Sequence, residues 1–455
     1  MQQVNLGMIG GGTVGSGVFH ALQLNGGLMA SRIGVKVAVR KIAVKAFDEP
    51  RPYEIPRAVM TTDWQSVVHD PDIHLIAELV GGTTLARTMI LTALQLGKPV
   101  ITANKALLSA HGEQLFAAAK KYGTNLYYEA SVCGGIPIIK SLREGFVGNR
   151  IHALYGIVNG TCNYILTRMK LEGAGFATVL ADAQRQGYAE TPPDLDVDGW
   201  DAQHKIGILA SLAHGFWVRP REIHVEGIRP VSAMDIKFAG ELGYTIKLLG
   251  IVKQIEGLRL TTDAATGPSA RKSSSENRKC RVQVSVYPTL IPNAHVLAGV
   301  NHVFNAVFVR GDIVGDTLFY GRGAGKDATA SAVLSDLADA ALDLKFGTKH
   351  RVPPFVPHEG AGAVVPIEDV VSQYFVRLNV ADRPGVLAKI AAIFGRSKIG
   401  ISSVIQPEGH EGESVPLIFM LHYATNGAVM KALTRIAKLS VVKSEPVMIR
   451  VENFE

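Results

Sequence analysis

The chain has 455 residues, which is too long for one ordinary hydrophobic core, so we expect two to four domains. Hydrophobic residues make up 47% and charged residues 19%, which excludes a disordered protein. The net charge of +7 is scattered rather than gathered into the stripe of a nucleic-acid-binding protein, and no apolar run could span a membrane. The first residues do not resemble a signal peptide, and the cysteines lack metal-ligand spacing, so we expect a cytoplasmic protein.

Residues 1–150 alternate short apolar runs with helical patterns, beginning with the strand candidate Val4–Ile9. Such alternation predicts an α/β fold, a mainly parallel sheet covered by helices, and here a Rossmann-type nucleotide domain. Further strands are predicted at Val35–Val44, Leu75–Val80, Val100–Thr102 and Leu126–Glu129, and helices at Thr84–Leu96 and Ser109–Tyr122.

Residues 151–345 read differently, as an α+β domain for substrate binding and dimerisation, and a homodimer or homotetramer is expected. The helix predicted at Thr329–Leu344 could return to the first domain, and the polar stretch Ala264–Cys280 predicts a surface loop. The proline-rich residues 346–371 predict a linker. The other elements expected in the middle region are strands at Tyr155–Val158 and Val282–Tyr287 and helices at Phe176–Gln186 and Trp200–His214.

A glycine-rich run follows the first strand and opens a helix. Gly10-Gly11-Gly12-Thr13-Val14-Gly15 fits G-x-G-x-x-G, the pattern of a dinucleotide-binding turn. Gly10 would make the tight turn, Gly12 would let the backbone approach a pyrophosphate, and Gly15 would let the helix pack closely. The alternative is a glycine-rich turn without a ligand.

Basic residues lie where an acidic residue at the end of the second strand would favour NAD. Arg40, Lys41 and Lys45 occupy this region, and a cation there can pair with a 2′-phosphate, so NADP is favoured over NAD. The alternative is that these side chains simply face solvent. Lys105 comes just after the strand Val100–Thr102, at the sheet edge that holds ligands in open α/β sheets, so it is predicted to contact cofactor or substrate.

The stretch Gly187–Lys205 gathers several acids and ends in a lysine. Asp201 and Lys205 are spaced to share one face of a helix, where the carboxylate and the local burial together could tune Lys205 for proton transfer. Glu190 could pair with a substrate ammonium group. The alternative is an acidic loop beside an exposed helix, with a weak surface ion pair.

This stretch resembles the homoserine dehydrogenase signature A-x-x-x-G-[YF]-[AS]-x-x-[DNS]-P-x-x-D-[LIV]-x-G-x-D-x-x-x-K. The resemblance covers residues 1–345, and Pro192 departs from it where the family prefers Asp, Asn or Ser. The positions that match are Ala183, Gly187, Tyr188, Ala189, Pro193, Asp196, Val197, Gly199, Asp201 and Lys205.

The resemblance implies that L-homoserine and NAD(P)+ interconvert with L-aspartate 4-semialdehyde and NAD(P)H. It implies that Lys205 donates and accepts the proton, with Lys105 beside the cofactor, and that Glu190, Asp196 and Asp201 form the substrate site. The cofactor residues implied, together with those of the glycine-rich run, are Thr13, Val14, Thr83, Lys105, Gly187 and Gly325. The resemblance further implies a monovalent cation, usually sodium, near Glu129, Val132, Gly134 and Ile136, although these residues could equally form a plain glycine-rich turn.

Residues 372–455 alternate predicted strands and helices, and they look like an ACT domain, a ferredoxin-like module that binds amino acids. The resemblance places its ligand at the turn Asp382–Gly385 and suggests L-threonine as a feedback effector. A purely structural or dimerising module is the alternative.

Two other functions remain open on the sequence. A semialdehyde dehydrogenase that forms an acyl intermediate would need a nucleophilic cysteine, for which Cys133 and Cys162 are candidates. A non-catalytic sensor could use the nucleotide fold and the C-terminal module to bind metabolites, although Asp201 and Lys205 are both present.

Overall fold

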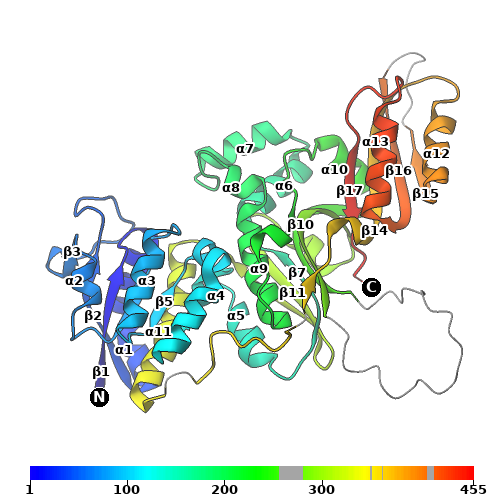
Figure 1. Ribbon diagram of the computed structural model, residues 1–455. Helices are drawn as coiled ribbons and strands as arrows, with labels where there is room; N and C mark the ends of the chain where they lie inside the picture. The colour runs from blue at the N-terminus through cyan, green and yellow to red at the C-terminus, as the bar shows by residue number, and fades with distance from the viewer. Residues whose placement is uncertain (256–279, 349–350, 361, 407–413, 455) are drawn as a thin grey trace, which may run out of the picture. The chain divides into compact units, whose positions relative to one another are not determined.

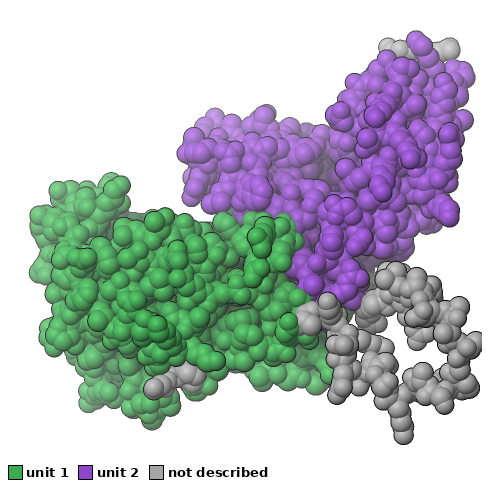
Figure 2. All heavy atoms as spheres, viewed as in Figure 1, with its two compact units in different colours: residues 1–160, 201–223, 303–362 green, residues 161–200, 224–302, 363–455 purple. Residues whose placement is uncertain are grey.

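The computed structural model describes residues 1–255, 280–348, 351–360, 362–406 and 414–454. Most of the loop predicted at Ala264–Cys280 lies outside these residues. No helix within the described ranges is long and apolar enough to cross a membrane. The chain divides into two compact units, coloured in Figure 2: unit 1 comprises residues 1–160, 201–223 and 303–362, and unit 2 comprises residues 161–200, 224–302 and 363–455.

Unit 1 is built on a six-stranded parallel sheet in the order β3-β2-β1-β4-β5-β6. This is the strand order of dinucleotide-binding folds, in which the ligand crevice opens where the order reverses, here between β1 and β4. The predicted Rossmann-type fold is thereby confirmed. The strands are β1 (Gln2–Ile9), β2 (Val35–Ala43), β3 (Met60–Thr61), β4 (Leu75–Glu78), β5 (Val100–Thr102) and β6 (Leu126–Tyr127).

Helices connect and cover this sheet (Figure 1). Helices α1 and α11 pack together and share one apolar core with β1, to which Val18, Leu22 and Val333 contribute. The predicted return of the late helix to the first domain is thus confirmed. The principal helices are α1 (Thr13–Ile33), α3 (Leu85–Gln95), α4 (Lys105–Tyr122) and α11 (Lys326–Phe346), with the short α2 (Gln65–Val68) beside them.

Two boundaries differ from the sequence prediction for local reasons. Helix α4 begins at Lys105 rather than at Ser109, because the Asn104 side chain accepts the backbone N–H of Leu107 and caps the helix. Strand β6 ends at Tyr127, and Glu129 starts a short 3-10 turn instead of continuing the strand. Both differences bring predicted site residues to the start of a turn or helix.

Unit 1 also contains an antiparallel sheet that positions the end of β7. The chain leaves β7 through Val158 and Asn159, and residues 201–214 of helix α9 belong to the same unit. Helix α9 has the bounds predicted from the sequence. The elements are β7 (Ile151–Ile157), β11 (Phe304–Gly311), β12 (Gly315–Arg322), α5 (Ile138–Lys140) and α9 (Trp200–His214).

Unit 2 is centred on the long antiparallel pair β9 and β10. Strand β10 extends well beyond the predicted Val282–Tyr287 and is buried along almost its whole length. The loop at residues 187–199 follows α7 and contains the short helix α8. The elements are α6 (Gly160–Glu172), α7 (Phe176–Arg185), α8 (Asp194–Val197), β8 (His224–Val225), α10 (Ala233–Glu241), β9 (Tyr244–Gln254), β10 (Arg281–Pro292) and β13 (Ala363–Val364).

The C-terminal part of unit 2 is a βαββαβ module with sheet order β17-β14-β16-β15. It has an apolar core of its own, in which Phe394 and Phe419 pack edge to face. Strand β17 also pairs in parallel with β10, through Thr289 and Arg450. The elements are β14 (Val371–Ala381), α12 (Val386–Arg396), β15 (Ile401–Ile405), β16 (Ser414–Thr425), α13 (Asn426–Ala437) and β17 (Val447–Val451).

Two arginines fix this module to the β9–β10 region of unit 2. Arg450, only 1% exposed, lies over the Tyr287 ring and forms an ion pair with Glu226 at 2.8 Å. Arg377 on β14 pairs with the fully buried Asp235 of α10 at 2.6 Å. Because removing one member of a buried pair leaves the other charge uncompensated, these contacts resist separation of the module from the rest of the unit.

Candidate functional site

The turn after β1 has the geometry of a ligand-binding glycine loop. Gly10 has a φ of +111°, and a Cβ on Gly15 would lie 2.0 Å from the Gly10 carbonyl oxygen, so these two positions require glycine. A Cβ on Gly12 would meet nothing within 4 Å. Internal packing therefore does not explain Gly12, whereas close approach of a ligand to the backbone would.

The start of helix α1 is open to an anion. Thr13 and Val14 form its first turn, which carries no acidic residue, so the backbone N–H groups and the helix dipole are not neutralised by a side-chain carboxylate there. Thr83 follows β4 after Gly81 and Gly82, both of positive φ, and Gly325 precedes α11 with a φ of +120°. The predicted cofactor residues of unit 1 thus lie on loops of the nucleotide fold.

Among the basic residues at the end of β2 and just after it, Arg40 and Lys45 are exposed, but Lys41 is held in an ion pair with Asp70 at 2.7 Å. Arg51, which no sequence pattern singles out, donates from Nε to the Gly11 carbonyl at 3.1 Å. It also donates to the carbonyls of Phe47 and Ala46. Arg51 therefore adds a guanidinium directly beside the dinucleotide turn.

Asp201 lies between two lysines. Its Oδ2 accepts from Lys205 Nζ at 2.7 Å, and its Oδ1 contacts Lys105 Nζ at 2.9 Å. The side chains of Asp201 and Lys205 are 5% and 8% exposed, whereas that of Lys105 is 34% exposed. The structure thus brings three of the predicted site residues together, from the starts of α4 and α9.

The end of β7 completes this cluster. The Val158 carbonyl accepts from Lys205 Nζ at 2.7 Å, and Asn159 Nδ2 donates to Asp201 Oδ2 at 2.9 Å. Asn159 was not predicted as a site residue, although the Asn159-Gly160-Thr161 run directly after a strand is a polar signal that could have marked it. Lys205 and Asp201 are therefore oriented by backbone and amide groups as well as by each other.

The charges in the cluster favour an ionised Asp201. Burial alone would raise the pKa of this carboxyl, but Lys205 and Lys105 outweigh burial and hold the pKa well below its usual range. Burial also lowers the pKa of the neighbouring His204, despite the opposing effect of Asp201. A fixed carboxylate that holds an ammonium in a dry site can direct a proton toward a substrate oxygen.

The predicted substrate residues Glu190 and Asp196, with Gly187, belong to unit 2, on the loop at 187–199. Glu190 is exposed, and its backbone carbonyl accepts from Gln184 at 3.1 Å. The backbone carbonyl of Asp196 accepts from the Cys162 thiol at 3.1 Å. At the irregular Pro192 of this loop, the peptide bond is cis.

The cysteine-nucleophile alternative finds little support in the structure. Cys133 and Cys162 are both buried. Burial raises the pKa of the Cys133 thiol, which disfavours the thiolate that an acyl-transfer nucleophile requires.

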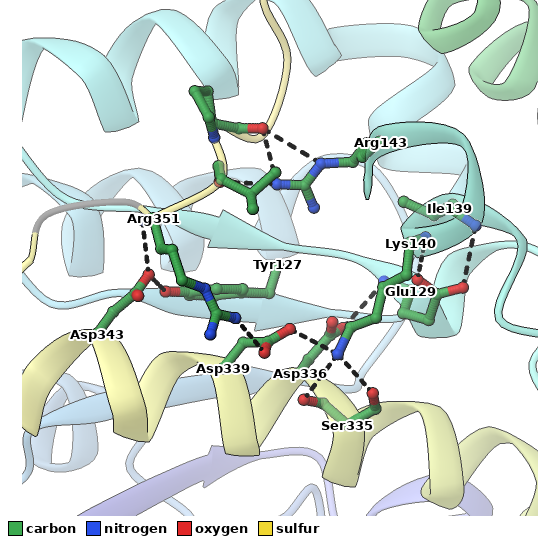
Figure 3. A network of polar contacts seen from close by, with 12 residues as sticks. Tyr127, Glu129, Ile139, Lys140, Arg143, Ser335, Asp336, Asp339, Asp343 and Arg351 are labelled. Atoms are coloured by element: carbon green, nitrogen blue, oxygen red, sulfur yellow. Dashed lines mark hydrogen bonds and ion pairs between the residues drawn. The ribbon is translucent and has the colours of Figure 1, made fainter. Parts of the chain in front are cut away.

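The residues predicted for a monovalent cation lie in one buried turn at 129–136. The Glu129 carboxylate accepts the backbone N–H groups of Ile139 and Lys140 at 3.0 and 2.7 Å, as Figure 3 shows. Burial raises the pKa of Glu129 to about 7. A cation would relieve this burial cost, so the donor set fits one. No cluster of three or more His, Cys, Asp or Glu side chains suited to a metal occurs among the residues described.

Acidic residues on one face of α11 connect this turn to the sheet (Figure 3). Asp336 accepts the Glu129 N–H at 2.9 Å, Asp339 pairs with Lys140 at 2.5 Å, and Asp343 accepts from the Tyr127 hydroxyl at 2.7 Å. Burial and the nearby Glu129 raise the pKa of Asp336. The helical spacing of these acids within an Ala- and Leu-rich helix is the sequence signal for this network.

Comparisons with known proteins agree with this arrangement. A family model described as homoserine dehydrogenase matches residues 137–338, and one described as the NAD binding domain of homoserine dehydrogenase matches residues 10–129. The chain is 39% identical to homoserine dehydrogenase of Pseudomonas aeruginosa, covering 100% of both chains, and 41% identical to that of Synechocystis, covering 98% of this chain and 99% of the other.

A solved homoserine dehydrogenase structure from Thiobacillus denitrificans superimposes with a TM-score of 0.88 at 38% identity, covering 100% of this chain and 99% of that one. An archaeal homoserine dehydrogenase in complex with NADPH superimposes with a TM-score of 0.58 at 25% identity, covering 75% of this chain and 98% of that one. The chain belongs to the homoserine dehydrogenase family and is an NAD(P)-dependent oxidoreductase of amino-acid biosynthesis.

Proposed function

We propose that this enzyme interconverts L-homoserine and L-aspartate 4-semialdehyde, in the synthesis of threonine, methionine and isoleucine, with Lys205 as its proton carrier. The observation that carries the proposal is the buried contact of Lys205 with Asp201, which Lys105 shares. Family membership favours this enzyme over the sensor and the acyl-forming dehydrogenase. We further propose that it acts in the cytoplasm.

The nicotinamide cofactor, when bound, accepts or supplies the hydride. In the reductive direction the Lys205 ammonium donates a proton to the aldehyde oxygen, and in the oxidative direction the neutral amine takes the hydroxyl proton. Asp201 and the Val158 carbonyl orient the Lys205 amine, and Lys105 lies on the other oxygen of Asp201. Glu190, Asp196 and Asp201 are the proposed substrate-binding residues, and the Glu190 carboxylate suits the substrate ammonium.

Replacing Lys205 tests the proton-carrier role. Lys205→Met keeps the length of the side chain but removes the proton, so NADP+ reduction with L-homoserine should fall by about 10²-fold or more. The NADP+ dissociation constant should change by less than about 2-fold, because Lys205 is not among the proposed cofactor-binding residues. A substitution away from a binding site typically changes the free energy by only a few tenths of a kcal/mol. Lys431→Met, at an exposed lysine of α13, is the control. Equal rates for wild type and Lys205→Met would refute the mechanism.

We propose NADP as the preferred cofactor, with NAD as a poorer alternative. The glycine turn, the open start of α1, Lys105, Thr83, Gly187 and Gly325 would hold the dinucleotide. Arg40 on β2 and Lys45 just after it are both exposed near the end of this strand, where the adenosine ribose would lie, and either can pair with a 2′-phosphate. The archaeal relative in complex with NADPH supports this choice.

Removing the positive charges of Arg40 and Lys45 should therefore weaken the binding of NADP+ but not the binding of NAD+. For Arg40→Ser/Lys45→Ser we expect the KM for NADP+ to rise about 10- to 100-fold, because a charge-assisted contact to phosphate contributes about 1.5–3 kcal/mol. The KM for NAD+ should stay nearly constant. Lys36→Ser, at an exposed lysine on β2, should change neither value. An equal rise for both nucleotides would contradict the assignment.

We propose that sodium or another monovalent cation binds at Glu129 with Val132, Gly134 and Ile136. Because the pKa of Glu129 is raised to about 7, the folded protein holds this proton more tightly than the unfolded chain, and folding stability falls as pH rises through this range. A cation competes with the proton and should offset that loss above about pH 7.

Melting experiments check this proposal. Sodium chloride should raise the Tm of wild type more at pH 8 than at pH 6, relative to tetramethylammonium chloride at equal ionic strength. Glu129→Gln should abolish the sodium-specific rise at both pH values. A sodium effect that is independent of pH, or that persists in Glu129→Gln, would rule out this site.

We propose that the C-terminal module is an ACT domain that binds L-threonine as a feedback effector. Its βαββαβ order and its sheet order β17-β14-β16-β15 support a ferredoxin-like ACT fold. Asp382 and Gly385 line a hollow of 440 Å³ at the start of α12, with Gln406 bonded to Asp382 at 3.1 Å.

We propose four domains along the chain, at residues 1–150, 151–345, 346–371 and 372–455. We also propose that the protein assembles as a homodimer or a homotetramer. A measurement of its mass in solution would distinguish the two assemblies.

Threonine should lower the wild-type rate of homoserine oxidation. Because Asp382 can pair with an amino-acid ammonium, Asp382→Ala should raise the half-inhibitory threonine concentration about 10-fold or more, the loss expected for one charge-assisted contact. Rates are compared as fractions of each variant's uninhibited rate. Absence of both inhibition and binding in wild type would remove the proposal.

A further inference from the structure

A buried carboxylate lies beneath the nucleotide loop, outside the catalytic cluster. Glu78 ends β4 and is 0% exposed. Its Oε1 accepts the backbone N–H groups of Val80 and Gly81 at 3.0 and 3.2 Å. No cation of the described residues forms an ion pair with it, and burial raises its pKa. Burying an unpaired carboxylate is costly, so its hydrogen bonds must supply the compensation.

The second oxygen of Glu78 connects β4 to β5. Thr102 donates its hydroxyl to Glu78 Oε2 at 2.7 Å and accepts the backbone N–H of Asn104 at 3.0 Å. Asn104 in turn accepts the N–H of Leu107 at 3.1 Å and donates from Nδ2 to the Gly82 carbonyl at 2.7 Å. The chain of bonds therefore closes a ring between the loop after β4 and the first turn of α4.

Packing cannot hold this loop in place. Gly81 and Gly82 both have positive φ, and a Cβ at either position would meet nothing within 4 Å. Hydrogen bonds to Glu78 and Asn104 attach residues 80–82 of this loop. Thr83, a proposed cofactor residue, is next in the chain, and the other side of the ring is the cap of the helix that begins at Lys105.

We propose that Glu78, Thr102 and Asn104 form a positioning network that holds the nucleotide loop and Lys105 in register. The proposal rests on the proposed function, in which Thr83 and Lys105 line the cofactor site. A carboxylate suits this position because both of its oxygens must accept. A glutamine that turned its amide donor toward Thr102 would leave the Thr102 hydroxyl hydrogen without its acceptor.

Substitutions at Thr102 separate this role from general stability. Thr102→Val keeps the shape but removes both the donor and the acceptor, whereas Thr102→Ser keeps the hydroxyl. Thr317→Val removes a hydroxyl bond from β12 to the Val309 carbonyl on β11, in the same unit, and is the matched control. Glu78→Gln is a second variant, which keeps the shape of the side chain.

Three quantities are measured: the NADP+ dissociation constant without homoserine, kcat, and amide hydrogen exchange at Gly81 and Leu107 in nucleotide-free enzyme. Thr102→Val should weaken NADP+ binding and lower kcat, each by about 10-fold, because it leaves buried hydrogen-bonding groups without a partner. Exchange at both amides should accelerate by a similar factor. Glu78→Gln should change all three in the same direction, and Thr102→Ser and Thr317→Val should stay within about 2-fold of wild type.

If Thr102→Val and Glu78→Gln match Thr317→Val in NADP+ affinity and amide exchange, the network has no positioning role and the proposal is overturned. Failure of the proposed function is distinguishable from this result. It would appear as an unchanged rate in Lys205→Met, while exchange at Gly81 and Leu107 would still report on the network.

Discussion

The proposed catalytic cluster depends on one buried carboxylate that two lysines share. Asp201 is almost fully buried, and such a charge is tolerated only if cations and hydrogen-bond donors surround it. Lys205, Lys105 and Asn159 supply them from three separate elements. The carboxylate in turn holds the two lysines in position, because their ammonium groups are stabilised by the opposite charge of Asp201.

The nucleotide fold explains how these groups meet. Parallel strands end at one edge of the sheet, and β4 and β5 deliver the loop before Thr83 and the cap before Lys105 to that edge. Glu78 and Thr102, one on each strand, join the two ends. The proposed cofactor loop and the proposed proton-carrying cluster therefore meet at the start of α4, where Lys105 follows the Asn104 cap and contacts Asp201.

Much of this arrangement could be predicted from the sequence where the signal is local. The spacing of Asp201 and Lys205 on one helix face, the glycine turn and the bounds of α9 all follow from short-range periodicity. The polar run after β7 could mark Asn159 but not its partner Asp201, and no pattern marks Arg51, because both partners lie far away in the chain. The start of α4 at Lys105 was not predicted, because it depends on the Asn104 side chain turning back to accept the backbone N–H of Leu107.

The parallel pairing of β17 with β10 could not be predicted from the sequence either, because no local pattern indicates which strands far apart in the chain will pair. With Arg450 on Glu226 and Arg377 on Asp235, it gives the C-terminal module a continuous connection to the other strands of unit 2. The C-terminal module therefore shares one compact unit with Glu190 and Asp196.

The shared charge of Asp201 is tested most directly by the Tm values of Asp201→Asn, Lys205→Met and the double variant. Asp201→Asn leaves two neighbouring ammonium groups without their carboxylate, so the account predicts a large fall in Tm. Adding Lys205→Met to that variant should recover part of the loss, because it removes one uncompensated buried charge. Tm losses that simply add in the double variant would contradict the account.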